Sequence, residues 1–156
     1  MKDLVDDLRS TLAAESIRLL AITDDAAAVR PSAGKWSPKE VIRHLIDSAS
    51  NNHGRFVRAQ ITEDMVFPGY DQDAWVRIQR YNERSWMDLV NLWRSLNSHI
   101  VSLVEAIDPE TLSRLRTQHN LDQIAWRAIP RSQPATLEYF VRDYLAHMKH
   151  HLSQIP

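Results

Sequence analysis

The chain contains no cysteine among its 156 residues. This absence excludes disulfide bonds, thiolate metal sites, iron–sulfur clusters and cysteine nucleophiles. Any transition metal bound by the protein must therefore have nitrogen or oxygen ligands. Histidine is the residue to follow, because the sequence contains seven of them.

Long apolar runs and an excess of charge of one sign are also missing. No segment approaches the roughly 20 apolar residues that a membrane-spanning helix needs. The first seven residues alternate charged and apolar side chains, unlike a signal or transit peptide. We therefore expect a cytoplasmic protein with no membrane partner. The 19 basic and 20 acidic residues give a net charge of −1, which argues against nucleic acid as a partner.

Glycine is scarce, with three residues, and the Asn-Gly and Asp-Gly pairs typical of β-hairpins do not occur. Apolar residues recur instead at the three- and four-residue spacing of amphipathic helices. This spacing predicts long helices over residues 2–28, 38–60, 85–107 and 136–155, a short helix over 73–81, and a loop over 117–133. The length fits a single domain covering residues 1–156. We predict an all-α fold, an up-down four-helix bundle with one or two short extra helices.

The strongest local signal marks the start of the second long helix. Ser37 occupies the N-cap position, Pro38 the first helical position, and Glu40 completes a capping box three residues after the cap. Thr136 stands at the corresponding cap position of the last helix. The segment Asp108-Pro109-Glu110 ends the third long helix and can start a short one.

Two histidines on the last helix share one face. His147 and His151 are four residues apart, which stacks their side chains within reach of a common ion. Imidazole nitrogen binds zinc, nickel, copper and iron, so the pair can be half of a metal site. The alternative is a partly exposed polar edge of the helix.

The candidate for a third ligand is His44, which lies beside the apolar stripe of the second long helix. The alternative for His44 is a core histidine satisfied by one hydrogen bond. Burying three imidazoles without an ion would, however, leave several polar atoms to satisfy. We expect the remaining histidines to face solvent, namely His53, His99, His119 and His150.

The sequence also suggests positions for two aspartates and for the tryptophans. Asp47 and Asp143 are the carboxylates nearest in sequence to the candidate ligands, and either could orient an imidazole, but a surface position is the simpler interpretation. The five tryptophans are interpreted as packing residues of the bundle, namely Trp36, Trp75, Trp86, Trp93 and Trp126.

Three blocks of the sequence resemble the DinB-like family of metal-binding four-helix bundles. They are Trp36-Ser37-Pro38-Lys39-Glu40-Val41-Ile42-Arg43-His44-Leu45, then Asp73-Ala74-Trp75-Val76 followed by Tyr81 and Trp93, and finally His147-Met148-Lys149-His150-His151-Leu152-Ser153-Gln154-Ile155. The resemblance implies that His44, His147 and His151 hold a divalent transition metal, Zn²⁺ or Ni²⁺. It also implies a homodimer.

The same resemblance implies a function related to bacillithiol- or mycothiol-dependent transferases. In that case a small-molecule thiol and a small electrophile are the substrates, and the sulfur belongs to a substrate because the chain has no cysteine. Two alternatives stay open. One is a non-catalytic bundle in which the metal ties two helices together, and the other is a metal-dependent hydrolase. The sequence does not decide whether the protein is an enzyme.

Overall fold

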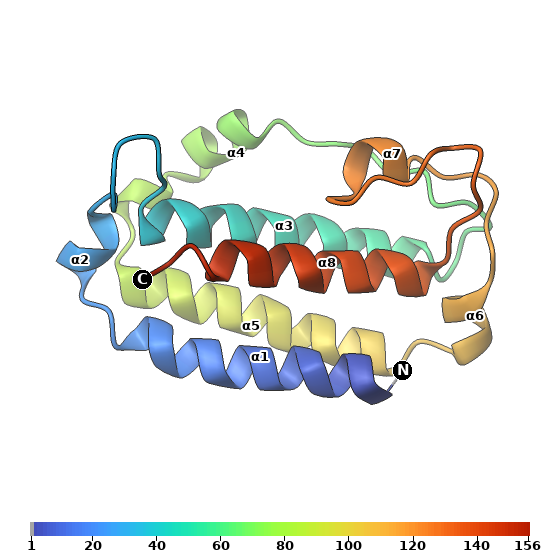
Figure 1. The fold of residues 1–156 in the computed structure, drawn as a ribbon, viewed down its shortest axis with the longest axis horizontal. Coiled ribbons are helices and arrows are strands. Elements are labelled where there is room, and N and C mark those ends of the chain that lie inside the picture. The colour runs from blue at the N-terminus through green and yellow to red at the C-terminus, as the bar shows by residue number, and fades with distance from the viewer. Residues whose placement is uncertain (1) are drawn as a thin grey trace.

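The computed structural model describes residues 2–156, except for the side chains of Asp73, Val76 and Asn82. Asp73 and Val76 belong to the second block of the family resemblance, and their side chains lie outside the described part of the chain. Four long helices lie side by side (Figure 1): α1 (Lys2–Leu20), α3 (Pro38–Arg58), α5 (Trp86–Glu105) and α8 (Leu137–Leu152). The predicted all-α four-helix bundle is confirmed.

Asp24, the first residue of the short helix α2 (Asp24–Ala28), joins the starts of two long helices. Its carboxylate accepts a hydrogen bond from Lys39 Nζ at 2.8 Å and another from the backbone N–H of Trp86 at 2.6 Å. Helices α3 and α5 therefore begin at the same end of the bundle and run in the same direction, opposite to α1 and α8 (Figure 1). The connection over residues 59–85 crosses the length of the bundle, so the helix directions do not strictly alternate.

The prediction of one helix over residues 2–28 is wrong, because the first helix ends at Leu20 and a second one starts at Asp24. The side chain of Thr23 accepts a hydrogen bond from the backbone N–H of Ala26 and caps α2. Two acidic residues follow Thr23, and negative charge is favourable in the first turn of a helix. The cap and the acidic residues therefore start a new helix here, although the apolar spacing of the first helix continues through this segment.

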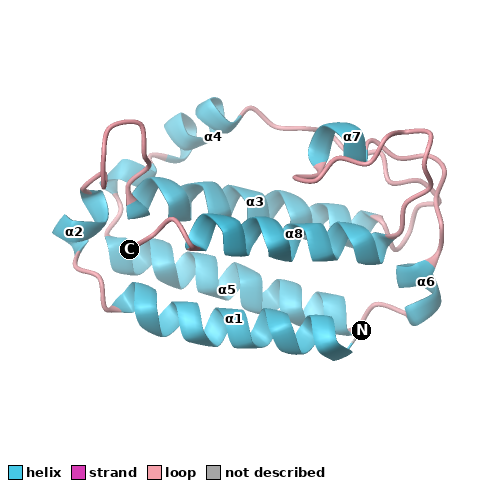
Figure 2. Cartoon of the chain, viewed as in Figure 1, coloured by secondary structure: helices cyan, strands magenta, loops and turns pink. Residues whose placement is uncertain are grey.

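The connections hold more short helices than the one or two predicted (Figure 2). Besides α2 they are α4 (Gln72–Gln79), the 3₁₀ helix η1 (Tyr81–Glu83), α6 (Pro109–Ser113) and α7 (Leu121–Ile124). The predicted loop over 117–133 thus contains one helical turn. Among the described residues, β-pairing is limited to two isolated bridges, Met65 with His119 and Arg116 with Ala135.

The predicted helix starts are confirmed by their caps. The backbone N–H of Glu40 donates to Ser37 Oγ at 3.3 Å, and the backbone N–H of Ser37 donates to Glu40 Oε2 at 2.7 Å. Both bonds of the capping box are therefore present. Thr136 caps α8, and Asp108 caps α6.

The core lies where the apolar faces of the four long helices meet. Its largest fully buried side chains include Trp93, Phe56, Phe140, Leu4, Leu8, Leu19, Ile42, Leu45, Leu89 and Ile100. This core fixes α3 against α8, the two helices that carry the candidate ligands. Within residues 2–156, none of the helices combines the length and the apolar character needed to cross a membrane.

Candidate metal centre and its cavity

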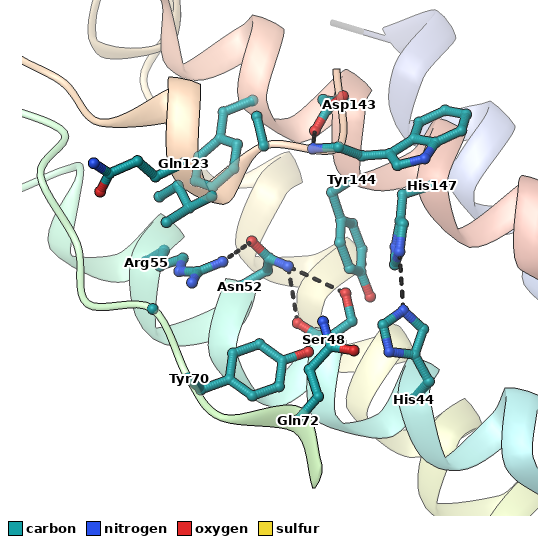
Figure 3. A pocket seen from close by; sticks show the side chains of 15 residues that line it. His44, Ser48, Asn52, Arg55, Tyr70, Gln72, Gln123, Asp143, Tyr144 and His147 are labelled. Atoms are coloured by element: carbon teal, nitrogen blue, oxygen red, sulfur yellow. Dashed lines mark hydrogen bonds between the residues drawn. The ribbon is translucent and has the colours of Figure 1, made fainter. Parts of the chain in front are cut away.

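Three histidines that are far apart in the sequence converge between two helices. His44 comes from α3, and His147 and His151 come from α8; one ligand atom of each lies within 4.8 Å of the others. The Nε2 atoms of His44 and His147 are 3.0 Å apart, and Figure 3 shows these two rings facing each other. These are the three residues that helical spacing selected.

Local geometry explains the convergence. The four-residue spacing on α8 brings the ring centroids of His147 and His151 to 4.5 Å from each other. Met148 and Leu152, the residues that follow each histidine, are buried in the core and fix the rotation of α8 about its axis. The packing of α3 on α8 then places the His44 ring 4.6 Å from the His151 ring.

Burial keeps the three imidazoles neutral. Desolvation is the largest cause that lowers the pKa of His44 to about 4 and that of His147 to about 3, and the charge of neighbouring histidines lowers both further. Desolvation also lowers the pKa of His151. At pH 7 all three rings are in the neutral form, which is the form that binds metal.

This donor set fits a divalent metal ion. Two imidazole nitrogens bound tetrahedrally at 2.0–2.1 Å lie about 3.3 Å apart, close to the 3.0 Å between His44 and His147. Among the described residues, Nδ1 of His151 is a buried nitrogen with no hydrogen-bond partner. Three protein ligands leave at least one coordination position open, a pattern typical of catalytic rather than structural sites.

The other four histidines lie outside this cluster, and His99 and His150 are exposed to solvent, as expected. His150 stacks on Trp126, with the ring centroids 5.1 Å apart, and its ring centroid is 5.2 Å from that of His151. His53, half-buried on α3, and His99, exposed on α5, have ring centroids 4.8 Å apart. They form a separate pair between the two parallel helices.

The prediction that His119 faces solvent is wrong. Its side chain is buried, Nε2 donates to the carbonyl of Gln133 at 2.7 Å, and Nδ1 accepts from the backbone N–H of Leu121 at 3.3 Å. His119 therefore holds the loop over 117–133 in place. The backbone groups that satisfy it come from a segment without helical period, so its sequence neighbourhood carries no signal of burial.

Two tryptophans border the histidine cluster. The ring of Trp36 lies 5.9 Å from that of His151, nearly parallel to it, and 5.5 Å from that of His44. The ring of Trp126 lies 6.1 Å from that of His147. Trp36 and Trp126 remain 42% and 41% exposed, so the prediction of bundle packing is wrong for them. It holds for Trp86 and Trp93, which are buried in the core.

Asp143 is buried rather than at the surface. Its two oxygens accept the backbone N–H groups of Trp126 and Arg127, each at 2.8 Å. Burial raises the pKa of this carboxyl group, and the two hydrogen bonds oppose that change. Asp143 acts on the site by holding Trp126 against His147.

Asp47 is also buried, with 1% exposure, which contradicts the predicted surface position. It accepts hydrogen bonds from Tyr81 Oη at 2.8 Å and from Gln79 Nε2 at 2.7 Å. Asp47 therefore fixes the end of α4 and the start of η1 to α3. Burial raises its pKa.

A cavity of about 290 Å³ opens next to His44 and His147 (Figure 3). Its wall is formed by polar residues of α3, by the turn around Gly69, by α7 and the loop after it, and by α8. The polar residues of this wall, chiefly Ser48, Asn52, Arg55 and Tyr70, are not among the candidate site residues predicted from the sequence. Ser48, Asn52 and Arg55 follow His44 at helical spacing, which is the one signal that could have indicated them.

The fold and the site together are those of a metal-binding four-helix bundle. The chain belongs to the DinB superfamily, whose family model matches residues 8–155. The family expected from the three sequence blocks is thereby confirmed.

Proteins with similar sequences are named as metal-dependent hydrolases. A protein of Oceanobacillus iheyensis named "putative metal-dependent hydrolase" is 30% identical over 122 residues, which are 78% of this chain and 64% of that protein. A second protein of the same organism and name is 26% identical over 85% of this chain and 74% of its own length. The matched region thus spans less than two thirds of the first relative.

A solved structure shares the fold. YfiT from Bacillus subtilis, described as a probable metal-dependent hydrolase with an unusual four-helix bundle topology, superposes with a TM-score of 0.78. The match covers 99% of this chain and 82% of YfiT, with 20% sequence identity. At this identity the likeness concerns the fold alone.

Proposed function

We propose that this chain is a divalent-metal-dependent hydrolase of small molecules. His44, His147 and His151 are the ligands, and Zn²⁺ or Ni²⁺ is the metal. The observation that carries the proposal is the convergence of three half-buried, neutral imidazoles beside a cavity of small-molecule size. The names of the relatives support hydrolysis over other chemistries.

The side chains around the site have separate roles. A divalent metal, when bound, lowers the pKa of a water or thiol at its open position and so supplies a nucleophile at neutral pH. The three histidines hold the metal, and their low pKa values keep protons from competing for the ligand nitrogens. Trp36 and Trp126 flank the cluster and limit the access of bulk water. Asp143 keeps Trp126 in that position.

Thiol transfer to a small electrophile is the second candidate. The carboxylate on the cavity wall, Asp143, is engaged by two backbone N–H groups and is poorly placed to act as a general base. A thiol needs less help from a base than water does, because its intrinsic pKa is much lower. The sequence resemblance that suggests thiol transfer also implies a homodimer. Sedimentation velocity at several protein concentrations tests this oligomeric state directly.

The two activities are separated by one set of assays. Protein loaded with Zn²⁺ or with Ni²⁺ is incubated with p-nitrophenyl acetate, a peptide p-nitroanilide and bis(p-nitrophenyl) phosphate, and separately with 1-chloro-2,4-dinitrobenzene plus cysteine or bacillithiol. We expect hydrolysis by the loaded protein that is lost in His147→Ala and retained in His150→Ala. Turnover only in the thiol assays would favour the transferase. Equal rates with and without metal in every assay would support the non-catalytic bundle.

A further inference from the structure

Arg55 is a buried cation on the wall of the cavity beside the histidines. Its exposure is 5%, and it lies on α3 eleven residues after His44, which places the two Cα atoms about 16 Å apart along the helix. The cavity touches both residues, and Figure 3 shows Arg55 on its wall with Asn52 and Tyr70. The cavity thus runs from the candidate metal to a positive charge.

The charge of Arg55 has no counter-ion in the described part of the chain. Its guanidinium donates to the carbonyl of Pro68 at 3.0 Å and to Asn52 Oδ1 at 3.3 Å, and both acceptors are neutral. The salt bridges among the described residues do not include it. A buried charge with no partner of opposite sign costs free energy.

The other two buried arginines of the described chain differ in this respect. Arg43 has Glu40 at 3.9 Å, and Arg116 has the charge of Glu63 nearby. For Arg55, the ionisable neighbour that acts on it among the described residues is the hydroxyl of Tyr70. Burial raises the pKa of Tyr70 to about 12, so that this hydroxyl is neutral at pH 7.

The rest of the cavity wall suits a small organic acid. Asn52 and Tyr70 add neutral polar groups beside the guanidinium, and Phe140 and Ile124 supply apolar surface. Among the described residues, the wall contains one carboxylate, that of Asp143, and it is engaged by two backbone N–H groups. A single guanidinium matches a singly charged carboxylate, which it can bind through two parallel hydrogen bonds.

We propose that the substrate of this site is a small organic acid whose carboxylate is bound by Arg55 while its reacting group lies at the three histidines. The placement of the reacting group at the three histidines rests on the proposed function. The carboxylate end rests on the uncompensated charge of Arg55 and can be tested without metal. Arg55 is a binding residue for the substrate and takes no part in bond breaking.

Binding to chelator-treated protein tests the carboxylate end. The probes are 3-phenylpropanoate and its uncharged amide, 3-phenylpropanamide, titrated by calorimetry at pH 7 and low salt. We expect the wild-type chain to bind the carboxylate about tenfold more tightly than the amide, because a charge-assisted bidentate pair forms only with the carboxylate. Equal affinity for the two probes in the wild type would overturn the proposal and requires no variant.

Variants then assign the preference to Arg55. Arg55→Gln removes the charge but keeps a donor for the carbonyl of Pro68, and it should bring the ratio of the two affinities close to one. Arg55→Lys keeps the charge and should retain part of the preference. Arg58→Gln is the matched control, because Arg58 is exposed on the same helix and does not line the cavity. An unchanged ratio in Arg55→Gln would show that Arg55 only holds the turn at Pro68.

Metal-loaded protein separates this inference from the proposed function. If the carboxylate preference depends on Arg55 but no probe is hydrolysed, the binding site stands and the proposed hydrolase fails. If loaded protein hydrolyses neutral and carboxylate-bearing p-nitrophenyl esters, such as p-nitrophenyl acetate and mono-p-nitrophenyl succinate, with equal kcat/KM, the hydrolase stands and the inference fails. Preference for the succinate ester that disappears in Arg55→Gln supports both.

Discussion

The Nε2 atoms of His44 and His147 lie 3.0 Å apart although 103 residues separate them in the chain. Neither helix can place these atoms alone, because His44 belongs to α3 and His147 to α8. The contact depends on the packing of the two helices through the shared core. Metal binding at this centre should therefore depend on the three histidines and also on the residues that hold α3 against α8.

The ligand assignment predicts a metal content that depends on particular histidines. Protein prepared with excess Zn²⁺ or Ni²⁺ and then dialysed should hold close to one metal per chain by mass spectrometric elemental analysis. His147→Ala should lose most of it, because two ligands bind far more weakly than three. His150→Ala is the matched control on the same helix and should keep its metal, since His150 is exposed and does not belong to the three-histidine cluster. Full occupancy in His147→Ala would contradict the assignment.

Metal affinity should persist into mild acid. Free histidine, with a pKa near 6.5, would begin to exchange metal for protons below that pH. Burial lowers the pKa of His44 to about 4 and that of His147 to about 3, so protons compete with metal only at lower pH. We expect less than about a threefold change in affinity between pH 7 and pH 5.5, measured by competition with a chelator of known proton dependence. A hundredfold loss over this range would argue against ligands whose pKa is lowered by desolvation.

The metal-free chain should lose stability in the same pH range. Between pH 6.5 and about 4, unfolded histidines take up protons while folded His44 and His147 stay neutral, so the free energy of unfolding falls as pH falls. The two residues together account for at most about 4 kcal/mol by pH 5. Urea unfolding at pH 7 and pH 5 measures the change. The double variant His44→Gln, His147→Gln should flatten it, and an equal slope in that variant would assign the effect to other groups.

Removing the metal should leave the bundle folded. The buried apolar residues of the four long helices form a core that includes no ligand atom, so folding does not depend on the ion. Binding at 100 to 1,000 times the dissociation constant adds only about 3 to 4 kcal/mol. After treatment with a chelator we expect an unchanged far-ultraviolet circular dichroism spectrum and a lower but still cooperative Tm. Loss of helicity on chelation would favour the purely structural metal site.

Asp143 should matter for stability and for the position of Trp126, but not as a metal ligand. Asp143→Ala leaves the N–H groups of Trp126 and Arg127 without their acceptor, at a cost of about 1–3 kcal/mol. Metal content should be retained, while the fluorescence of Trp126, isolated with Trp126→Phe as the reference, should shift as its ring leaves His147. Asp122→Ala is the control in the same loop, because its exposed ion pair with Arg131 contributes less than about 1 kcal/mol. Loss of metal in Asp143→Ala would mean that the loop supports the ligands directly.

Part of the fold follows from local rules that can be read in the sequence. The capping box of Ser37 and Glu40 and the cap at Thr136 start α3 and α8 where predicted, because each bond joins residues three apart. The pair His147 and His151 is local in the same sense. The end of the first helix at Leu20 also follows from local signals. The cap at Thr23 and the acidic residues after it can be read in the sequence, but the apolar spacing favours one continuous helix.

The remaining errors concern residues whose environment comes from distant segments. Asp47 and Asp143 are polar residues within α3 and α8, and their burial depends on Tyr81 and on the backbone at Trp126. His119 is buried by the loop that it holds. Trp36 and Trp126 are partly exposed because their rings lie beside the histidine cluster and not in the core. No local pattern carries this information.

By itself, the sequence determined the helical class, the starts of α3 and α8 and the pair His147 and His151, because periodicity, caps and i,i+4 spacing act over a few residues. The position of His44 beside an apolar stripe added the third candidate ligand, and three sequence blocks indicated the family through their resemblance to it. The tertiary structure alone decided that α3 and α5 run in the same direction (Figure 1), that a cavity joins the histidines to Arg55, and that the charge of Arg55 has no counter-ion among the described residues. These features depend on contacts between segments tens of residues apart, and such contacts are set by the packing of the whole core.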